Sequence, residues 1–319
     1  MNIAYRFRIY PTEEQKILLG KTFGCCRFLY NQMLNDKIQE YEKTKKMLKN
    51  TPAMYKREYP FLKEVDSLAL ANVQLHLEKA YKNFFRDPKI GFPKFKSKHH
   101  SRNSYTTNVV NGNILVESKR IRLPKLKWIA MKKHREPAKG LRLKSVTVSM
   151  EPSGKYFASL LYEGDSCENQ AAEPDYSTAK ILGIDYAMQG MAVFSEEIEM
   201  EEAGFFRKNE KRLVREQRKL SRCVRGSHNY ELQKKKVARC HEKIRNQRRD
   251  YLHKLSRKIV DSYDAVAVED IDMKAMGQCL HFGKSVQDNG YGMFREMLDY
   301  KLAWKGKKMV KVDRFFPSS

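Results

Sequence analysis

One segment near the middle of the chain constrains the fold most, because it differs from the sequence on both sides. Residues 164–179 are small, polar and acidic, a composition typical of a loop between periodic segments. A domain commonly spans about 100–200 residues, and this chain has 319. We therefore interpret residues 164–179 as a linker between two domains that have separate hydrophobic cores.

The first half combines strands with two long helices. Apolar residues alternate from Ile3 to Ile9 and predict a strand. Thr12 and Gln15 form a capping-box pattern that opens a helix over residues 12 to about 44, and a second helical stripe follows from Ser67 to Arg86. Short alternating segments over residues 104–163 predict further strands. Together with the first strand, they predict a small barrel or sandwich.

The second half alternates strands with helices, which is typical of an α/β domain. A long charged helical stretch occupies the middle of this half, and Gly226-Ser227-His228-Asn229 is expected to divide it into a helical hairpin. The other expected elements are strands at Ile181–Tyr186, Met191–Ser195, Ala265–Glu269 and Met309–Asp313, a turn at Gly190, and a helix over Gly292–Lys305.

The net charge indicates a polyanionic partner. The chain carries 63 Lys and Arg against 38 Asp and Glu, a formal charge of +25, and self-repulsion makes such a charge costly for a compact protein. No apolar run reaches the roughly 18 residues of a membrane span, and the N-terminus lacks a hydrophobic signal core. We therefore favour nucleic acid over a membrane, and expect a cytoplasmic protein that is associated with the nucleoid when bound to DNA.

Two acidic residues are candidates for a metal site. Asp185 and Glu269 each end an apolar strand of the α/β domain, so their carboxylates could meet at neighbouring strand ends. Mg²⁺ prefers oxygen ligands, and metal-assisted cleavage of a phosphodiester uses carboxylates in this way. The alternative is that both are ordinary surface carboxylates, since Asp270 and Asp272 show that acids are common nearby.

Positive charge is concentrated between Arg207 and Lys258. A charge run is often only a solvated helix face, but such faces usually mix both signs at four-residue spacing. This run has few acids, so we interpret it as a phosphate-binding surface. Its cations include Lys208, Lys211, Arg212, Arg215, Arg218, Lys219, Arg222, Lys234, Lys235, Lys236, Arg239, Arg245, Arg248 and Arg249.

The joint order of several short motifs resembles the TnpB/OrfB family, which consists of transposon-encoded RNA-guided nucleases related to type V CRISPR effectors. These motifs are Tyr5–Pro11, Gly91–Lys96, Gly183-Ile184-Asp185, Val268-Glu269-Asp270 and the segment from Val312 to Ser319. The resemblance implies a mixed α/β and α+β multidomain protein. A wedge-type β-barrel (residues 1–11 plus 89–163) would carry an inserted helical recognition unit (12–88). A RuvC-like domain of RNase H fold (180–319) would follow, with the basic hairpin at 205–260.

The resemblance also defines the expected active site. The family uses three carboxylates, of which Asp185 and Glu269 match the first two, while the third lies beyond a zinc ribbon of two Cys-x-x-Cys pairs. Neither the third acid nor the zinc ribbon has a counterpart in this chain. Asp288 and Asp313 are poor substitutes, so we expect Mg²⁺ to bind weakly or not at all, no zinc, and DNA binding without cleavage.

The implied partners are a guide RNA from the protein's own locus and a double-stranded DNA target with a short adjacent motif. Phe92, Lys94, Phe95 and Lys96 suit base stacking and phosphate contact, although they also fit a basic connector with two buried rings. Candidates for reading the adjacent motif are Asn72, Gln74 and Lys79, whose alternative role is ordinary helix surface.

Two other functions remain open at this point. The chain could be a fragment or degenerate copy of an active Mg²⁺-dependent RNA-guided DNA endonuclease, or a generic basic RNA-binding protein with a decayed RNase H fold. Co-purified RNA of one defined sequence would argue against the generic protein.

Overall fold

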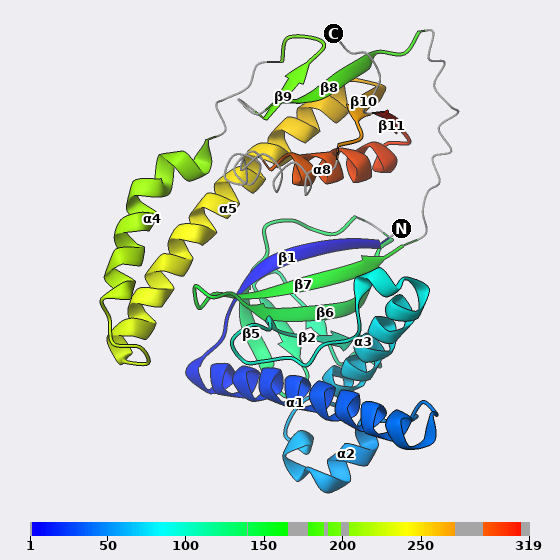
Figure 1. The fold of residues 1–319 in the computed structure, drawn as a ribbon, viewed down its shortest axis with the longest axis vertical. Coiled ribbons are helices and arrows are strands. Elements are labelled where there is room, and N and C mark those ends of the chain that lie inside the picture. Colours follow the sequence, from blue (N-terminus) through cyan, green and yellow to red (C-terminus); the bar gives the residue numbers. More distant parts are fainter. Residues whose placement is uncertain are drawn as a thin grey trace. The chain divides into compact units, whose positions relative to one another are not determined.

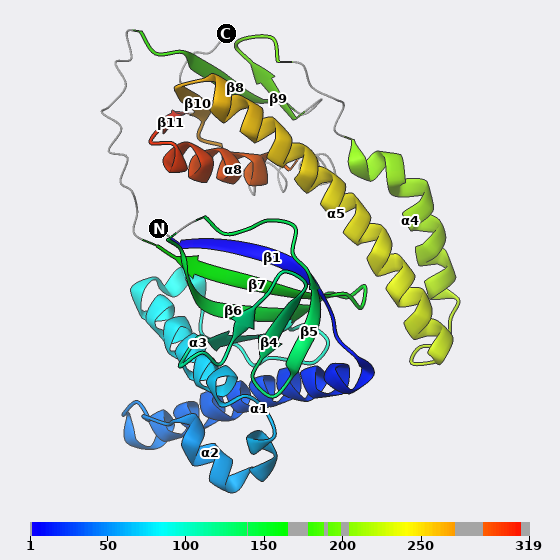
Figure 2. The same ribbon diagram turned by 180° about the vertical axis from the view of Figure 1, so that it is seen from behind.

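A computed structural model describes residues 2–138, 140–164, 178–187, 191–198, 204–271 and 290–313. The chain divides into two compact units, Met1–Asp165 and Ser166–Ser319 (Figures 1 and 2). Several positions singled out from the sequence lie outside the described residues. These are most of the expected linker, Gly190, Asp272, Asp288 and residues 314–319.

The first unit contains one seven-stranded sheet and the helices packed on it (Figure 1). Its strand order is β2-β6-β7-β1-β5-β4-β3, and every described pairing is antiparallel. The first strand joins this sheet as the sequence predicted, whereas closure into a wedge-type barrel stays a prediction. The elements are β1 (Asn2–Tyr10), α1 (Glu13–Thr44), α2 (Pro52–Glu58), η1 (Pro60–Lys63), α3 (Ser67–Arg86), η2 (Pro88–Ile90), β2 (Asn103–Asn108), β3 (Leu115–Val116), β4 (Arg120–Leu123), β5 (Lys127–Lys132), β6 (Arg142–Met150) and β7 (Tyr156–Glu163).

Helix α1 begins where the capping box predicted. The Thr12 side chain accepts a hydrogen bond from the Gln15 backbone N–H, and the Gln15 side chain accepts one from the Thr12 backbone N–H. The Gln15 amide also donates to the carbonyls of Leu126 and Trp128, both at 2.9 Å. Gln15 therefore both caps the start of α1 and attaches this helix to the sheet.

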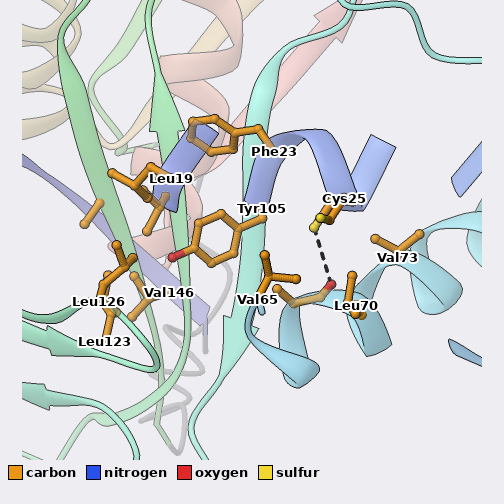
Figure 3. Packing of buried hydrophobic residues seen from close by; sticks show 14 of the residues in the cluster. Leu19, Phe23, Cys25, Val65, Leu70, Val73, Tyr105, Leu123, Leu126 and Val146 are labelled. Carbon is orange, nitrogen blue, oxygen red and sulfur yellow. Dashed lines mark hydrogen bonds between the residues drawn. The ribbon is translucent and has the colours of Figure 1, made fainter. Parts of the chain in front are cut away.

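The core of the first unit lies between one face of the sheet and helices α1 and α3. Period-two alternation directs Phe7 and Ile9 of β1 to this face, where both are buried. Figure 3 shows Tyr105 of β2 between Leu19 of α1 and Val146 of β6, close to the start of α3. This packing fixes α3 against β2, and so positions the side chains that line a polar pocket described below.

The second unit contains a four-stranded sheet of order β11-β10-β8-β9. Strand β10 is parallel to β8 and β11, and β9 is antiparallel to β8, so the predicted α/β organisation is confirmed. The buried strands pack on α5 and α8 through Leu252, Ile259, Phe294 and Leu298. The elements are β8 (Ile181–Ala187), β9 (Met191–Phe194), α4 (Phe205–Ser221), α5 (His228–Ser262), β10 (Ala265–Glu269), α8 (Tyr291–Trp304) and β11 (Lys308–Val312).

Helices α4 and α5 form the predicted hairpin (Figures 1 and 2). Gly226 turns the chain at φ +84°, and the Ser227 side chain caps α5 by accepting from the Tyr230 backbone N–H at 3.1 Å. Leu213, Cys240 and Ile244 form a small apolar seam between the two helices. Because this seam is narrow, most of the charged side chains of the hairpin remain at the surface.

Candidate functional site

The two candidate acids meet at one edge of the second sheet. In the parallel pair β8 and β10, Ile184 is in register with Val268, so Asp185 and Glu269 follow at the carboxyl ends of neighbouring strands. Their side chains are hydrogen-bonded to each other. This hydrogen bond raises the pKa of Glu269, and partial burial and the negative charge of Asp185 raise it further. We call Asp185 and Glu269 the acid pair.

The acid pair fits a divalent cation by its chemistry. Two adjacent carboxylates present the oxygen ligands that Mg²⁺ prefers, and a cation between them would offset their mutual repulsion. Bound Mg²⁺ would supply Lewis-acid chemistry and activation of water. Within the described ranges, no group of three or more His, Cys, Asp or Glu side chains is placed to hold a metal.

Two further acids, Asp270 and Asp313, directly follow strands β10 and β11. Asp270 follows Glu269 directly and contacts Arg295 of α8 at 3.4 Å. Asp313 follows β11, whose Val312 is in register with Glu269, and is exposed. Neither forms a described metal-binding group with the acid pair.

Helix α4 presents a face of positive charge. Its predicted cations Lys208, Lys211, Arg212, Arg215, Arg218 and Lys219 are all exposed, and so is Arg222 at the C-cap. A shallow surface pocket of about 540 Å³ is lined by Glu210, Lys211, Val214, Arg215, Arg218, Lys219 and Arg222. Glu216 lies 3.6 Å from Arg215 and accepts from the Gln233 amide of α5. Two acids, Glu210 and Glu216, therefore offset only part of the charge of these cations, and this face suits phosphate.

Helix α5 continues the basic surface with one difference. Lys234, Lys235, Arg239, Arg245 and Arg249 are exposed, whereas Arg248 is half-buried. The aliphatic part of Arg248 packs on Gly290 at the start of α8, where an added Cβ would lie 2.9 Å from the Arg248 Cδ. Arg248 therefore contributes to packing between α5 and α8, in addition to the nucleic-acid role predicted for it.

A polar pocket of about 170 Å³ lies in the first unit, between α1, α3 and β2. Its lining includes Arg27, Asn72, His76, Lys96 and Arg102 together with hydroxyl-bearing residues of β2. The buried Asn72 amide donates to the Leu68 carbonyl at 2.9 Å, and burial lowers the pKa of His76. Of the three candidates for the adjacent motif, Asn72 lines this pocket.

The other two candidates lie elsewhere on α3. The Gln74 amide donates to Glu78 at 2.8 Å, and Lys79 is exposed. Neither belongs to the lining of the polar pocket.

The connector after α3 mixes exposed and anchored side chains. Phe92 contacts Tyr81 and Phe84 edge-on at 5.5 and 5.4 Å between ring centroids, and it remains 44% exposed. Phe95 is 56% exposed, and Lys94 is exposed as well. The Lys96 ammonium instead lies 3.8 Å from the centroid of the Tyr30 ring. Lys94 and Phe95 are therefore more accessible to a nucleic acid than Lys96.

Sequence reasoning passed over a basic and aromatic surface on the outer face of the first sheet. The Arg6 and Arg8 guanidinium carbons lie 3.9 and 5.5 Å from the centroid of the Phe157 ring. Arg6 also pairs with the buried Glu151, which lies 3.8 Å from Arg102. The signal was present, because the alternation that buries Phe7 directs Arg6 and Arg8 to the opposite face.

Comparison with known proteins adds independent information about this chain. Residues 160–279 match the OrfB_IS605 family, described as "Probable transposase", and residues 1–46 match the HTH_OrfB_IS605 helix-turn-helix domain. A Streptomyces pristinaespiralis protein called "Putative RNA-guided DNA endonuclease" is 32% identical over 99% of this chain and 78% of its own length. The Escherichia coli K12 protein "Putative RNA-guided DNA endonuclease InsQ" is 30% identical over 99% and 81%.

The chain belongs to the TnpB/OrfB family. The fold agrees with a solved structure, the Cas12f1-sgRNA-target DNA complex, with a TM-score of 0.57 at 12% identity. That match covers 98% of this chain and 89% of the other. Within the described residues of this TnpB/OrfB family member, no helix is long and apolar enough to cross a membrane.

Proposed function

We propose that this protein binds a guide RNA and, through RNA–DNA pairing, a double-stranded DNA target, and that it occupies this target without cutting it. The observation that carries the proposal is the exposed basic face of α4. It is supported by two relatives, each called a putative RNA-guided DNA endonuclease, that align with 99% of this chain. Phosphate contacts hold a nucleic acid without reading its sequence, so the guide would supply the sequence specificity.

The binding-only mode is supported by the number of carboxylates. Among the described residues, no third His, Cys, Asp or Glu joins the acid pair in a metal-binding group, and a site of two carboxylates should hold Mg²⁺ weakly and misplace the attacking water. Such a protein would act as an RNA-guided repressor by blocking its DNA target.

A second candidate function is Mg²⁺-dependent, RNA-guided cleavage of DNA. It is favoured by the contact between Asp185 and Glu269 at adjacent strand ends. In this case a further ligand would complete the site.

We propose the polar pocket beside Asn72 as the reader of a short duplex motif next to the target. Its support is chemical, because the lining combines the cations Arg27 and Arg102 with the amide of Asn72 and with hydroxyl groups. Cations suit phosphate contacts, and amides and hydroxyls suit hydrogen bonds to base edges.

The test is to purify the protein with its co-expressed native locus, sequence the bound RNA, and add a matched duplex with Mg²⁺. We expect one defined RNA species, tight binding of the matched duplex, and no strand cleavage. A duplex with a scrambled target sequence is the control for guided binding, and Asp185→Ala is the control for chemistry.

Each other outcome selects a different function. Cleavage that Asp185→Ala abolishes would overturn the binding-only mode and establish the endonuclease. Equal affinity for matched and scrambled duplexes, with unrelated RNAs bound, would instead indicate a generic RNA-binding protein.

A further inference from the structure

Four aromatic side chains form a cluster at the end of α3 that is partly open to solvent. The Tyr81 and Phe85 rings are stacked at 6.1 Å between centroids, and the Phe84 ring lies 5.4 Å from that of Phe85. Phe92 contacts both Tyr81 and Phe84 from the connector. Of the four residues only Tyr81 is buried, whereas Phe85 is 65% exposed. We call Tyr81, Phe84, Phe85 and Phe92 the aromatic platform.

The backbone holds the aromatic platform in place. Tyr81 and Phe85 are four residues apart on α3, a spacing that puts two side chains on one helix face. After α3 ends, Gly91 adopts φ +84°, a conformation that favours glycine, and the next residue, Phe92, returns to the helix. The exposed rings are therefore presented in a fixed arrangement before any partner binds.

Exposed cations surround these rings. From Tyr81 to Lys98 the sequence contains a single acid, Asp87, whose carboxylate accepts from the Lys89 backbone N–H at 3.1 Å. Four cations of this stretch are exposed, and within the described ranges none of them has an ion-pair partner. They are Lys82, Arg86, Lys89 and Lys94.

A second aromatic cluster in the same unit has a different charge environment. Phe61 contacts Phe28 and Tyr59 at 5.3 and 6.0 Å between ring centroids and is 43% exposed, much like Phe92. Its neighbours in sequence include the acids Glu58 and Glu64. Partly exposed rings thus occur twice in this unit, but only those of the aromatic platform lie in a stretch with excess positive charge.

We propose that the aromatic platform stacks unpaired bases of a nucleic acid strand, while the four cations hold the phosphates of that strand. An aromatic ring stacks on any base whose face is free, and nearby cations track the backbone. In a duplex the base faces are covered by neighbouring pairs, so the platform selects single-stranded segments. A second copy of this chain fits less well, because its own platform would bring like charges together. The inference rests on the proposed binding of nucleic acid.

The experiment measures fluorescence anisotropy of three labelled probes with the full chain, freed of nucleic acid, at moderate salt. The probes are a short oligodeoxythymidylate, an abasic strand of the same length, and a duplex of the same length. We expect Phe85→Ala to weaken binding of the oligodeoxythymidylate by about tenfold. Binding of the abasic strand and the duplex should stay unchanged, because these probes offer phosphates but no free base faces.

Two further variants separate stacking from packing. Phe85→Leu keeps an apolar side chain but removes the aromatic face, so we expect it to lose most of the same affinity. Phe61→Ala removes a partly exposed ring from the other cluster and should leave all three probes bound as in the wild type. Equal Tm values for Phe85→Ala and the wild type would exclude unfolding as the cause.

Several results would overturn the inference. Unchanged oligodeoxythymidylate affinity in Phe85→Ala, or an equal loss in Phe61→Ala, would remove the aromatic platform from binding. If Phe85→Ala instead converts a dimer to a monomer in sedimentation and leaves the affinity unchanged, a second copy covers the platform. In these cases the wild type still binds the probes. A wild type that binds none of them would defeat the proposed nucleic-acid binding itself, so the two failures are distinguishable.

Discussion

Replacing Arg215, Arg218, Lys219 and Arg222 together with glutamate is expected to abolish RNA binding while the protein stays folded. These four residues are exposed and line one face of α4 and its C-cap. Their reversal turns four attractive phosphate contacts into repulsive ones, so we expect affinity to fall on the order of a thousandfold or more at moderate salt. Filter binding of the co-purified RNA over a salt series measures both the affinity and its salt slope.

A matched control separates this face from net charge. Replacing Lys43, Lys45, Lys46 and Lys49 with glutamate changes the formal charge by the same amount at exposed positions around the end of α1. We expect this variant to keep most of its affinity. Similar losses in the two variants would mean that total charge, rather than the α4 face, binds the RNA. Unchanged affinity in the α4 variant would contradict the assignment of that face.

Phe294→Ala is expected to destabilise the second unit selectively. The Phe294 side chain is fully buried between α8, α5 and the sheet, and removing a buried phenylalanine costs about 3–5 kcal/mol. A typical domain is stable by only about 5–15 kcal/mol. Because the units have separate cores, hydrogen exchange should show lost protection in β8, β10 and α5, and retained protection in β1 and β7.

Two variants test the reason for this effect. Phe294→Leu keeps most of the buried volume and should lose less stability than Phe294→Ala. Phe85→Ala removes a ring that is 65% exposed, so it should change stability by no more than about 0.5 kcal/mol. Equal loss of protection in both units after Phe294→Ala would show that they unfold as one body.

The candidate site was predictable in part. The sequence showed that Asp185 and Glu269 end apolar strands, and parallel strands in neighbouring positions bring such residues to one edge. It did not show that β10 lies directly beside β8, which decides that the two carboxylates touch.

The basic residues illustrate the same limit. A run of Lys and Arg at helical spacing predicted an exposed basic hairpin, and the exposed face of α4 agrees with it. The sequence did not separate Arg248 from its neighbours, although the Arg248 side chain packs on Gly290. That contact joins residues on two helices, so the periodicity of one helix cannot reveal it.

By itself, the sequence determined the elements and their character, because periodicity, caps and turn residues act within a few positions of one another. The helix that begins after Thr12, the helix from Ser67 to Arg86 and the turn at Gly226 are of this kind. The tertiary structure alone decided which side chains meet, both in the acid pair and in the pocket beside Asn72. These contacts depend on strand order, register and helix packing, which are properties of the whole chain.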